Sequence, residues 1–111
     1  MNLYDLSGSG IRSEKFDQLL SLEGVRIERI ISHGQCTPKG QWYDQSWDEW
    51  VLLISGKAGM LVGDCSDIVE LKPGDHMLLA AHQRHRVEWT DPEQSTIWLT
   101  VHINEGAEYV G

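Results

Sequence analysis

Two stretches of the chain concentrate the side chains that could do chemistry. Residues 40–49 contain three tryptophan or tyrosine rings, two amides and three carboxylates, and residues 74–87 contain three histidines. Carboxylates and imidazoles are the groups that proteins use as general acids and bases and as ligands of divalent metals. Indole and phenol rings supply large apolar walls with a polar edge. The sequence therefore offers acid–base or metal chemistry beside aromatic surface.

Glu49 precedes the apolar run Trp50–Ser55, and its position leaves two interpretations open. It is either a carboxylate satisfied by an arginine or a tryptophan N–H, or a metal ligand or general acid/base. A dry cavity would raise its pKa.

The tryptophans also leave two interpretations open, which are core packing and the wall of a ligand pocket. We expect Trp42 or Trp47 in the pocket and Trp50 in the core.

Length and charge limit the class of protein. A chain of 111 residues predicts one domain, and its 41% hydrophobic and 23% charged residues predict a soluble globule without a membrane span. The net charge of −8 argues against nucleic acid or anionic lipid as a partner. Residues 1–10 do not have the pattern of a signal peptide, so we expect a cytoplasmic protein in which Cys36 and Cys65 are free thiols.

Most of the chain has the pattern of short strands. Alternation over residues 25–33 and apolar runs at residues 50–55, 58–62, 68–71, 77–81, 86–90 and 96–103 predict strands, with turns between them. A tight reversal is expected at Pro73-Gly74, since proline sets φ and glycine accepts a positive φ. One short helix is expected after Ser13, as an N-cap, with Phe16, Leu19 and Leu20 on one face. The spacing favours an antiparallel sandwich or barrel.

Residues 40–56 resemble the first motif of the cupin superfamily. In that motif a glycine, a His-x-His pair and a glutamate are followed, after six further residues, by a glycine, and Glu49 and Gly56 have this last spacing. The His-x-His positions fall on Tyr43 and Gln45, or on Trp42 and Asp44 if one residue is added. Neither register contains a histidine, so the usual site of three histidines and one glutamate is absent.

Residues 73–87 resemble the second cupin motif. Gly74 and His85 occupy its glycine and histidine positions, while Ala80 replaces a proline and His82 replaces a glycine. The resemblance implies an all-β double-stranded β-helix, that is, a jelly-roll barrel over residues 25–111, preceded by an N-terminal extension with the short helix over residues 1–24. It also implies that His85 faces Glu49 inside the barrel.

The resemblance implies a reduced metal site. Its ligands would be His85 and Glu49, completed by Asp44 or His82, and its ion a divalent Zn, Fe, Ni or Mn. Tyr43 and Gln45 would orient a polar ligand rather than hold a cation. Glu49 and His85 are also the predicted catalytic pair.

Three functions stay open on this basis. The first is a cupin that binds a small molecule with a weakly held metal and has oxygenase, isomerase or decarboxylase activity. The second is a metal-free binding or sensing module in which the tryptophans grip the ligand, and the third is a structural domain with a filled barrel. We also expect a homodimer. Fold alone does not choose among these functions.

Overall fold

A computed structural model describes residues 1–64 and 66–104 of the chain, which form eight β-strands. In chain order these are β1 (Lys15–Leu22), β2 (Val25–Ser32), β3 (Asp48–Ser55), β4 (Ala58–Val62), β5 (Val69–Leu71), β6 (His76–Leu79), β7 (His85–Thr90) and β8 (Thr96–Ile103). All neighbouring strands pair in the antiparallel sense. The strands expected from the sequence between residues 25 and 103 are confirmed within a few residues at each end.

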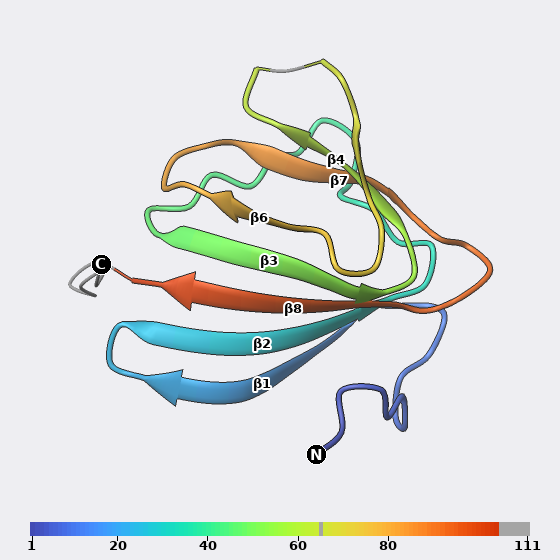
Figure 1. Ribbon diagram of the computed structural model, residues 1–111. Coiled ribbons are helices and arrows are strands. Elements are labelled where there is room, and N and C mark those ends of the chain that lie inside the picture. The colour runs from blue at the N-terminus through green and yellow to red at the C-terminus, as the bar shows by residue number, and fades with distance from the viewer. Residues whose placement is uncertain (65, 105–111) are drawn as a thin grey trace.

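The strands form two sheets that face each other. The larger sheet has the order β1-β2-β8-β3-β6, and the smaller has the order β5-β4-β7. Figure 1 shows β4 and β7 on one side of the molecule and β3, β8, β2 and β1 on the other. The chain therefore folds as an all-β jelly roll, with its interior between the two sheets.

The prediction of a short helix after Ser13 is wrong. This stretch is strand β1, which pairs along its length with β2 and has a bulge between Gln18 and Leu20. Period-two alternation prevails, because Phe16 faces the interior while Asp17 faces outward. Pairing with a neighbouring strand overrides a weak local helix signal. The described residues contain no helix, so none of them forms one that could cross a membrane.

The reversal at Pro73-Gly74 is confirmed. The amide of Asp75 donates to the carbonyl of Lys72 at 2.9 Å, and Gly74 has a φ of 94°. Gly56 after β3 is also required, because a Cβ there would lie 2.6 Å from the Cα of Thr96. These two glycines set the turns that return the chain between the strands carrying the two motifs.

The hydrophobic core fills one part of the space between the sheets. Its buried side chains are Val51, Leu53, Ala58, Met60, Leu71, Leu79 and Trp98.

Cys36 is a free, exposed thiol, as expected, whereas Cys65 lies outside the described residues. The division of the chain at residue 24 stays a prediction.

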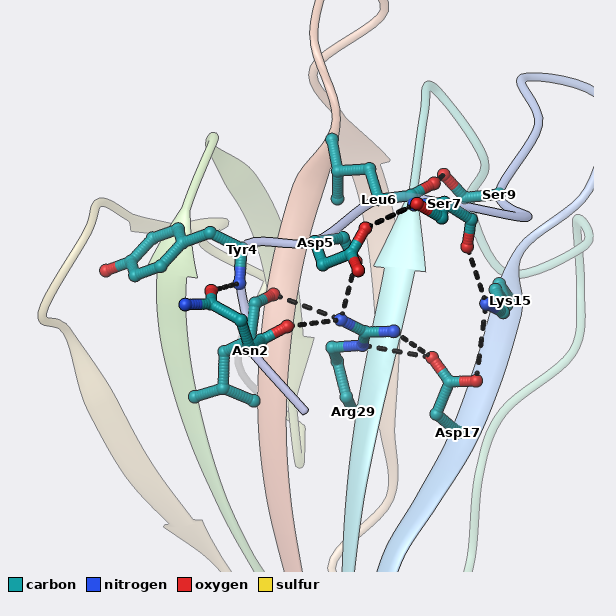
Figure 2. Close-up of polar contacts among 10 residues, drawn as sticks. Asn2, Tyr4, Asp5, Leu6, Ser7, Ser9, Lys15, Asp17 and Arg29 are labelled. Atoms are coloured by element: carbon teal, nitrogen blue, oxygen red, sulfur yellow. Dashed lines mark hydrogen bonds and ion pairs between the residues drawn. The ribbon is translucent and has the colours of Figure 1, made fainter.

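The N-terminal segment covers part of the outer face of the larger sheet. Arg29 of β2 is only 2% exposed there. Figure 2 shows its guanidinium between Asp17 of β1 and the N-terminal backbone. Nε and Nη2 donate to Asp17 Oδ2 at 3.0 and 2.6 Å, and Nη1 donates to the carbonyls of Asn2, Leu3 and Asp5. One buried cation therefore ties the N-terminus to two strands.

Candidate functional site

A cavity of about 140 Å³ lies between the two sheets. Its wall combines apolar side chains of the core with ten polar or ionisable ones. The lining residues are Glu14, Phe16, Glu28, Ile30, Cys36, Thr37, Tyr43, Gln45, Glu49, Val51, Met60, Leu79, His85, Val87, Trp98, Thr100 and His102. An engineered protein cavity of about 150 Å³ holds a benzene ring, so this one suits a ligand of about one ring.

Strand alternation decides which side chains reach the cavity. Successive side chains of a strand point to opposite faces, so residues two apart share a face. Glu28 and Ile30 of β2 line the cavity, while Arg29 between them faces outward. Glu49 and Val51 of β3 also line it, as do Trp98, Thr100 and His102 of β8.

Glu49 is a buried carboxylic acid in this wall, only 7% exposed. Burial is the main cause that raises its pKa to about 7, and the nearby Glu28 carboxylate raises it further. A hydrogen bond from the Gln45 side chain and the charge of Arg26 act in the opposite direction. At neutral pH Glu49 is therefore divided between its charged and uncharged forms and can give or take a proton.

His102 of β8 lies between two carboxylates, and its tautomer can be read from its partners. It is directly opposite Glu49 in the β3–β8 pairing. Trp47 Nε1 donates to His102 Nδ1 at 2.9 Å, and an indole N–H can only donate, so Nδ1 is the acceptor nitrogen. In the neutral ring the proton then sits on Nε2, which faces Glu28 Oε1 at 3.4 Å.

Because its lone pair accepts from Trp47, His102 Nδ1 offers Glu49 no donor. It lies 3.9 Å from Glu49 Oε1. Burial lowers the pKa of His102, and the charge of Arg26 adds to this, while Glu28 opposes it. His102 therefore does little to stabilise the charged form of Glu49.

His85 is 5% exposed and begins β7 at the same cavity. Burial lowers its pKa, against a smaller opposing effect of the Gln83 carbonyl. Nδ1 lies 3.2 Å from that carbonyl, so it carries the proton of the neutral ring, and Nε2 is left as the acceptor nitrogen. The Tyr43 ring stacks on His85 with centroids 5.5 Å apart, and the two backbones form an isolated bridge.

The predicted pocket residues divide into two groups. Tyr43 and Gln45 line the cavity, whereas Trp42 and Trp47 are not among its lining residues. Trp42 lies under the Arg84 guanidinium, 4.6 Å from the ring centroid. Trp47 instead acts behind the wall, through His102.

Arg86, which flanks His85 on β7, does not line the cavity and is buried. Its guanidinium is 9% exposed overall and donates to the carbonyls of Thr37, Pro38 and Gln41. Its Nε also lies 3.2 Å from Glu88 Oε1. Arg86 therefore fixes the loop that precedes β3.

The predicted metal ligands do not converge. Asp44 and His82 contact each other at 3.2 Å outside the cavity, with side chains 53% and 72% exposed, while Glu49 and His85 line it. Within residues 1–64 and 66–104, no group of three or more His, Cys, Asp or Glu side chains could hold a metal ion. The cavity side chains therefore do not fit the metal site that the family resemblance implies.

His82 has a structural role in the loop between β6 and β7. Its φ is 63°, a left-handed conformation at a position where cupins have glycine. Its amide donates to the Gln45 carbonyl at 2.6 Å, and the amide of Ala81 donates to Asp48 Oδ1 at 2.7 Å. These bonds hold the loop before β7 against the loop before β3.

Sequence reasoning missed two residues of the site, Glu28 and His102. Their alternation with other inward-facing residues is visible in the sequence. Placing them beside Glu49 requires the register of β2, β8 and β3, in which Glu28 pairs with Thr100 and His102 with Glu49. That register joins residues far apart in the chain.

Solved structures place this fold and cavity in a family. A Ralstonia eutropha protein, provisionally named a mannose-6-phosphate isomerase, is 44% identical with a TM-score of 0.89; the match covers 94% of this chain and 96% of that one. A Klebsiella pneumoniae protein with a double-stranded β-helix domain is 17% identical with a TM-score of 0.75, covering 97% and 91%. A cupin superfamily protein of Desulfitobacterium hafniense is 17% identical with a TM-score of 0.73, covering 90% and 85%.

The chain belongs to the cupin superfamily, as its two sequence motifs indicated. No protein-family model and no curated protein matches it.

Proposed function

We propose that this cupin binds a small molecule of about one ring in its cavity, without a metal ion. The observation that carries the proposal is that Glu49 and His85, from strands in different sheets, are both buried and both line one cavity. Buried polar groups normally find partners, and a ligand would supply one to the free acceptor nitrogen of His85. The apolar wall formed by Val51, Met60 and Trp98 would hold the ring.

The two polar groups would have different roles towards the ligand. His85 Nε2 accepts a hydrogen bond, since Nδ1 is engaged by the Gln83 carbonyl. Glu49 donates or accepts, because its pKa of about 7 keeps both forms populated. This exchangeable proton favours acid–base conversion of the ligand as a second candidate function.

The name of the Ralstonia eutropha protein does not by itself supply the substrate. A sugar phosphate carries up to two negative charges at neutral pH and is normally bound by arginine, lysine or helix N-termini. The described lining residues include three glutamates and no arginine or lysine. We therefore do not extend sugar-phosphate isomerisation to this chain.

Fluorescence of Trp98, which lines the cavity, gives a direct test. We expect ring-sized compounds to change the emission and to bind equally well after treatment with a chelator. His85→Ala should weaken their binding about tenfold, which corresponds to the loss of one hydrogen bond of about 1.4 kcal/mol. His76→Ala is the matched control, because His76 is exposed and packs on Trp50 away from the cavity.

Elemental analysis of the purified protein separates this proposal from the metal-binding alternative. We expect no stoichiometric Zn, Fe, Ni or Mn. A full equivalent of one of these metals, lost in His85→Ala but kept in His76→Ala, would contradict metal-free binding. The cytoplasmic location and the homodimer stay predictions, which cell fractionation and sedimentation velocity would test.

A further inference from the structure

The polar part of the cavity is built from carboxylates of three separate segments. Glu14 precedes β1, Glu28 lies on β2 and Glu49 on β3, and no lysine or arginine is among the described lining residues. Glu14 accepts a hydrogen bond from the Ser32 hydroxyl, and Glu28 faces Nε2 of His102. Neither contact places a full positive charge in the cavity. An anionic ligand would therefore meet repulsion from the wall, while a cationic ligand would meet attraction.

The rest of the wall also suits a cation. The rings of Phe16, Tyr43 and Trp98 line the same cavity, and aromatic faces attract cations within about 6 Å. His85 presents an acceptor nitrogen rather than a donor, since its Nδ1 proton points to Gln83. An ammonium group has only donors, so it matches these acceptors, whereas a carboxylate or phosphate does not.

We propose that the ligand of this cavity is a small monocationic amine carrying one ring, with its ammonium group at Glu49 and His85 and its ring against Trp98. This inference rests on the proposed function, because it requires that the cavity binds a small molecule. It narrows that function to one charge class and excludes phosphorylated sugars.

Binding of such an amine is coupled to release of a proton. Protonated Glu49 gives its proton to solvent and the ammonium group pairs with the resulting carboxylate, so charge and atoms balance. The other charged or titratable groups near Glu49 are Arg26 and Glu28 of β2, His102 of β8 and Tyr43 of the loop before β3, and His85 of β7 lines the same cavity. Glu49 has a pKa of about 7, so its carboxylate form becomes more abundant as the pH is raised to 7. The amine affinity should therefore increase by up to about tenfold for each pH unit as the pH is raised towards 7, and it should stay constant above pH 7.

Four probes separate the charge classes: benzylamine, benzyl alcohol and benzoate, which are of similar size, and the larger anion mannose 6-phosphate. Titration calorimetry on either side of pH 7 should give the tightest binding for benzylamine, weaker and pH-independent binding for benzyl alcohol, and none for the two anions. Glu49→Gln should weaken benzylamine binding about tenfold or more and remove its pH dependence, a larger loss than for the neutral benzyl alcohol. Glu70→Gln is the control, because Glu70 is exposed on β5 and does not line the cavity.

The outcomes distinguish this inference from the proposed function. If benzyl alcohol or either anion binds as tightly as benzylamine, the amine class is overturned while binding in the cavity stands. If no ring compound binds, the proposed function fails as well. Thermal unfolding of each variant excludes misfolding as the cause of lost binding. Should Glu49→Gln be misfolded, the pH dependence of benzylamine affinity in the unaltered protein still decides the question: a flat profile overturns the proposal.

Discussion

Arg29 and Glu49 are two buried ionisable side chains on opposite faces of the same sheet, and their surroundings differ. Arg29 is 2% exposed and uses Nε, Nη1 and Nη2 to bind Asp17 and three backbone carbonyls. Glu49 is 7% exposed and accepts a hydrogen bond from the Gln45 amide. The nearby Nδ1 of His102 donates nothing to it, because this nitrogen accepts from Trp47.

Arg29 is therefore a structural charge, which stays ionised and stabilises the fold, whereas Glu49 is an exchangeable charge, which gains and loses a proton near neutral pH. Burial of a charge is tolerated when every polar atom has a partner, as around Arg29, where the guanidinium hydrogen bonds lower the pKa of Asp17. Where partners are few, the charged form is destabilised and the group titrates near neutrality, as for Glu49. The outer face thus holds the N-terminus, and the inner face holds a carboxylic acid that titrates near neutral pH.

Removal of the Arg29 charge should have the largest effect on the free energy of unfolding. Arg29→Met leaves Asp17 without its main partner and frees the N-terminal carbonyls, so we expect unfolding in urea to show a loss of about 3–5 kcal/mol. Lys15→Gln is the control, since Lys15 lies 3.6 Å from the same carboxylate but is 31% exposed, and it should cost at most about 1 kcal/mol. Equal losses in the two variants would contradict the assignment of Arg29 as the central partner.

Removing the exchangeable charge should instead stabilise the protein at high pH. The folded pKa of Glu49, about 7, lies above its ordinary value of 4.5, so the folded form keeps a proton that the unfolded chain has released. Stability due to this group is therefore lost as pH rises from 4.5 through 7, by up to about 3 kcal/mol.

Urea unfolding of Glu49→Gln across this range checks the sign. Above pH 7 the variant should have a larger free energy of unfolding than the unaltered protein, and this difference should vanish near pH 4.5. A gain that is the same at every pH would show that Glu49 does not titrate as described. Glu70→Gln, with an exposed side chain, should show no such pH-dependent gain.

The tautomer of His102 can be changed by removing one indole N–H. In Trp47→Phe, Nδ1 loses its donor and can take up a proton close to Glu49, so the pKa of His102 should rise and that of Glu49 should fall. NMR titration of the imidazole follows both changes, and the lost hydrogen bond should cost about 1 kcal/mol. Trp42→Phe should leave the imidazole titration unaltered, because Trp42 contacts Arg84 and not His102.

The smallest effect on stability is expected from a change at His82, in the loop between β6 and β7. His82→Gly relieves a left-handed backbone conformation, worth about 1 kcal/mol, but loses an exposed contact with Asp44 worth less than that. Chemical denaturation should therefore show a change within about 1 kcal/mol, and benzyl alcohol binding should be unaltered. A large loss of binding would mean that His82 belongs to the site after all.

The strands from β2 onward and the turn at Pro73-Gly74 could be predicted from the sequence, because alternation and turn chemistry are local signals. The resemblance to the two cupin motifs implied that Glu49 and His85 lie in one interior. Tertiary structure alone decided that β1 is a strand, since its partner β2 supplies the hydrogen bonds that a helix would have supplied internally. It also decided that His102 lies between Glu28 and Glu49, and that Asp44 and His82 bind each other outside the cavity. Those contacts depend on the register between strands distant in the chain, and no local pattern encodes that register.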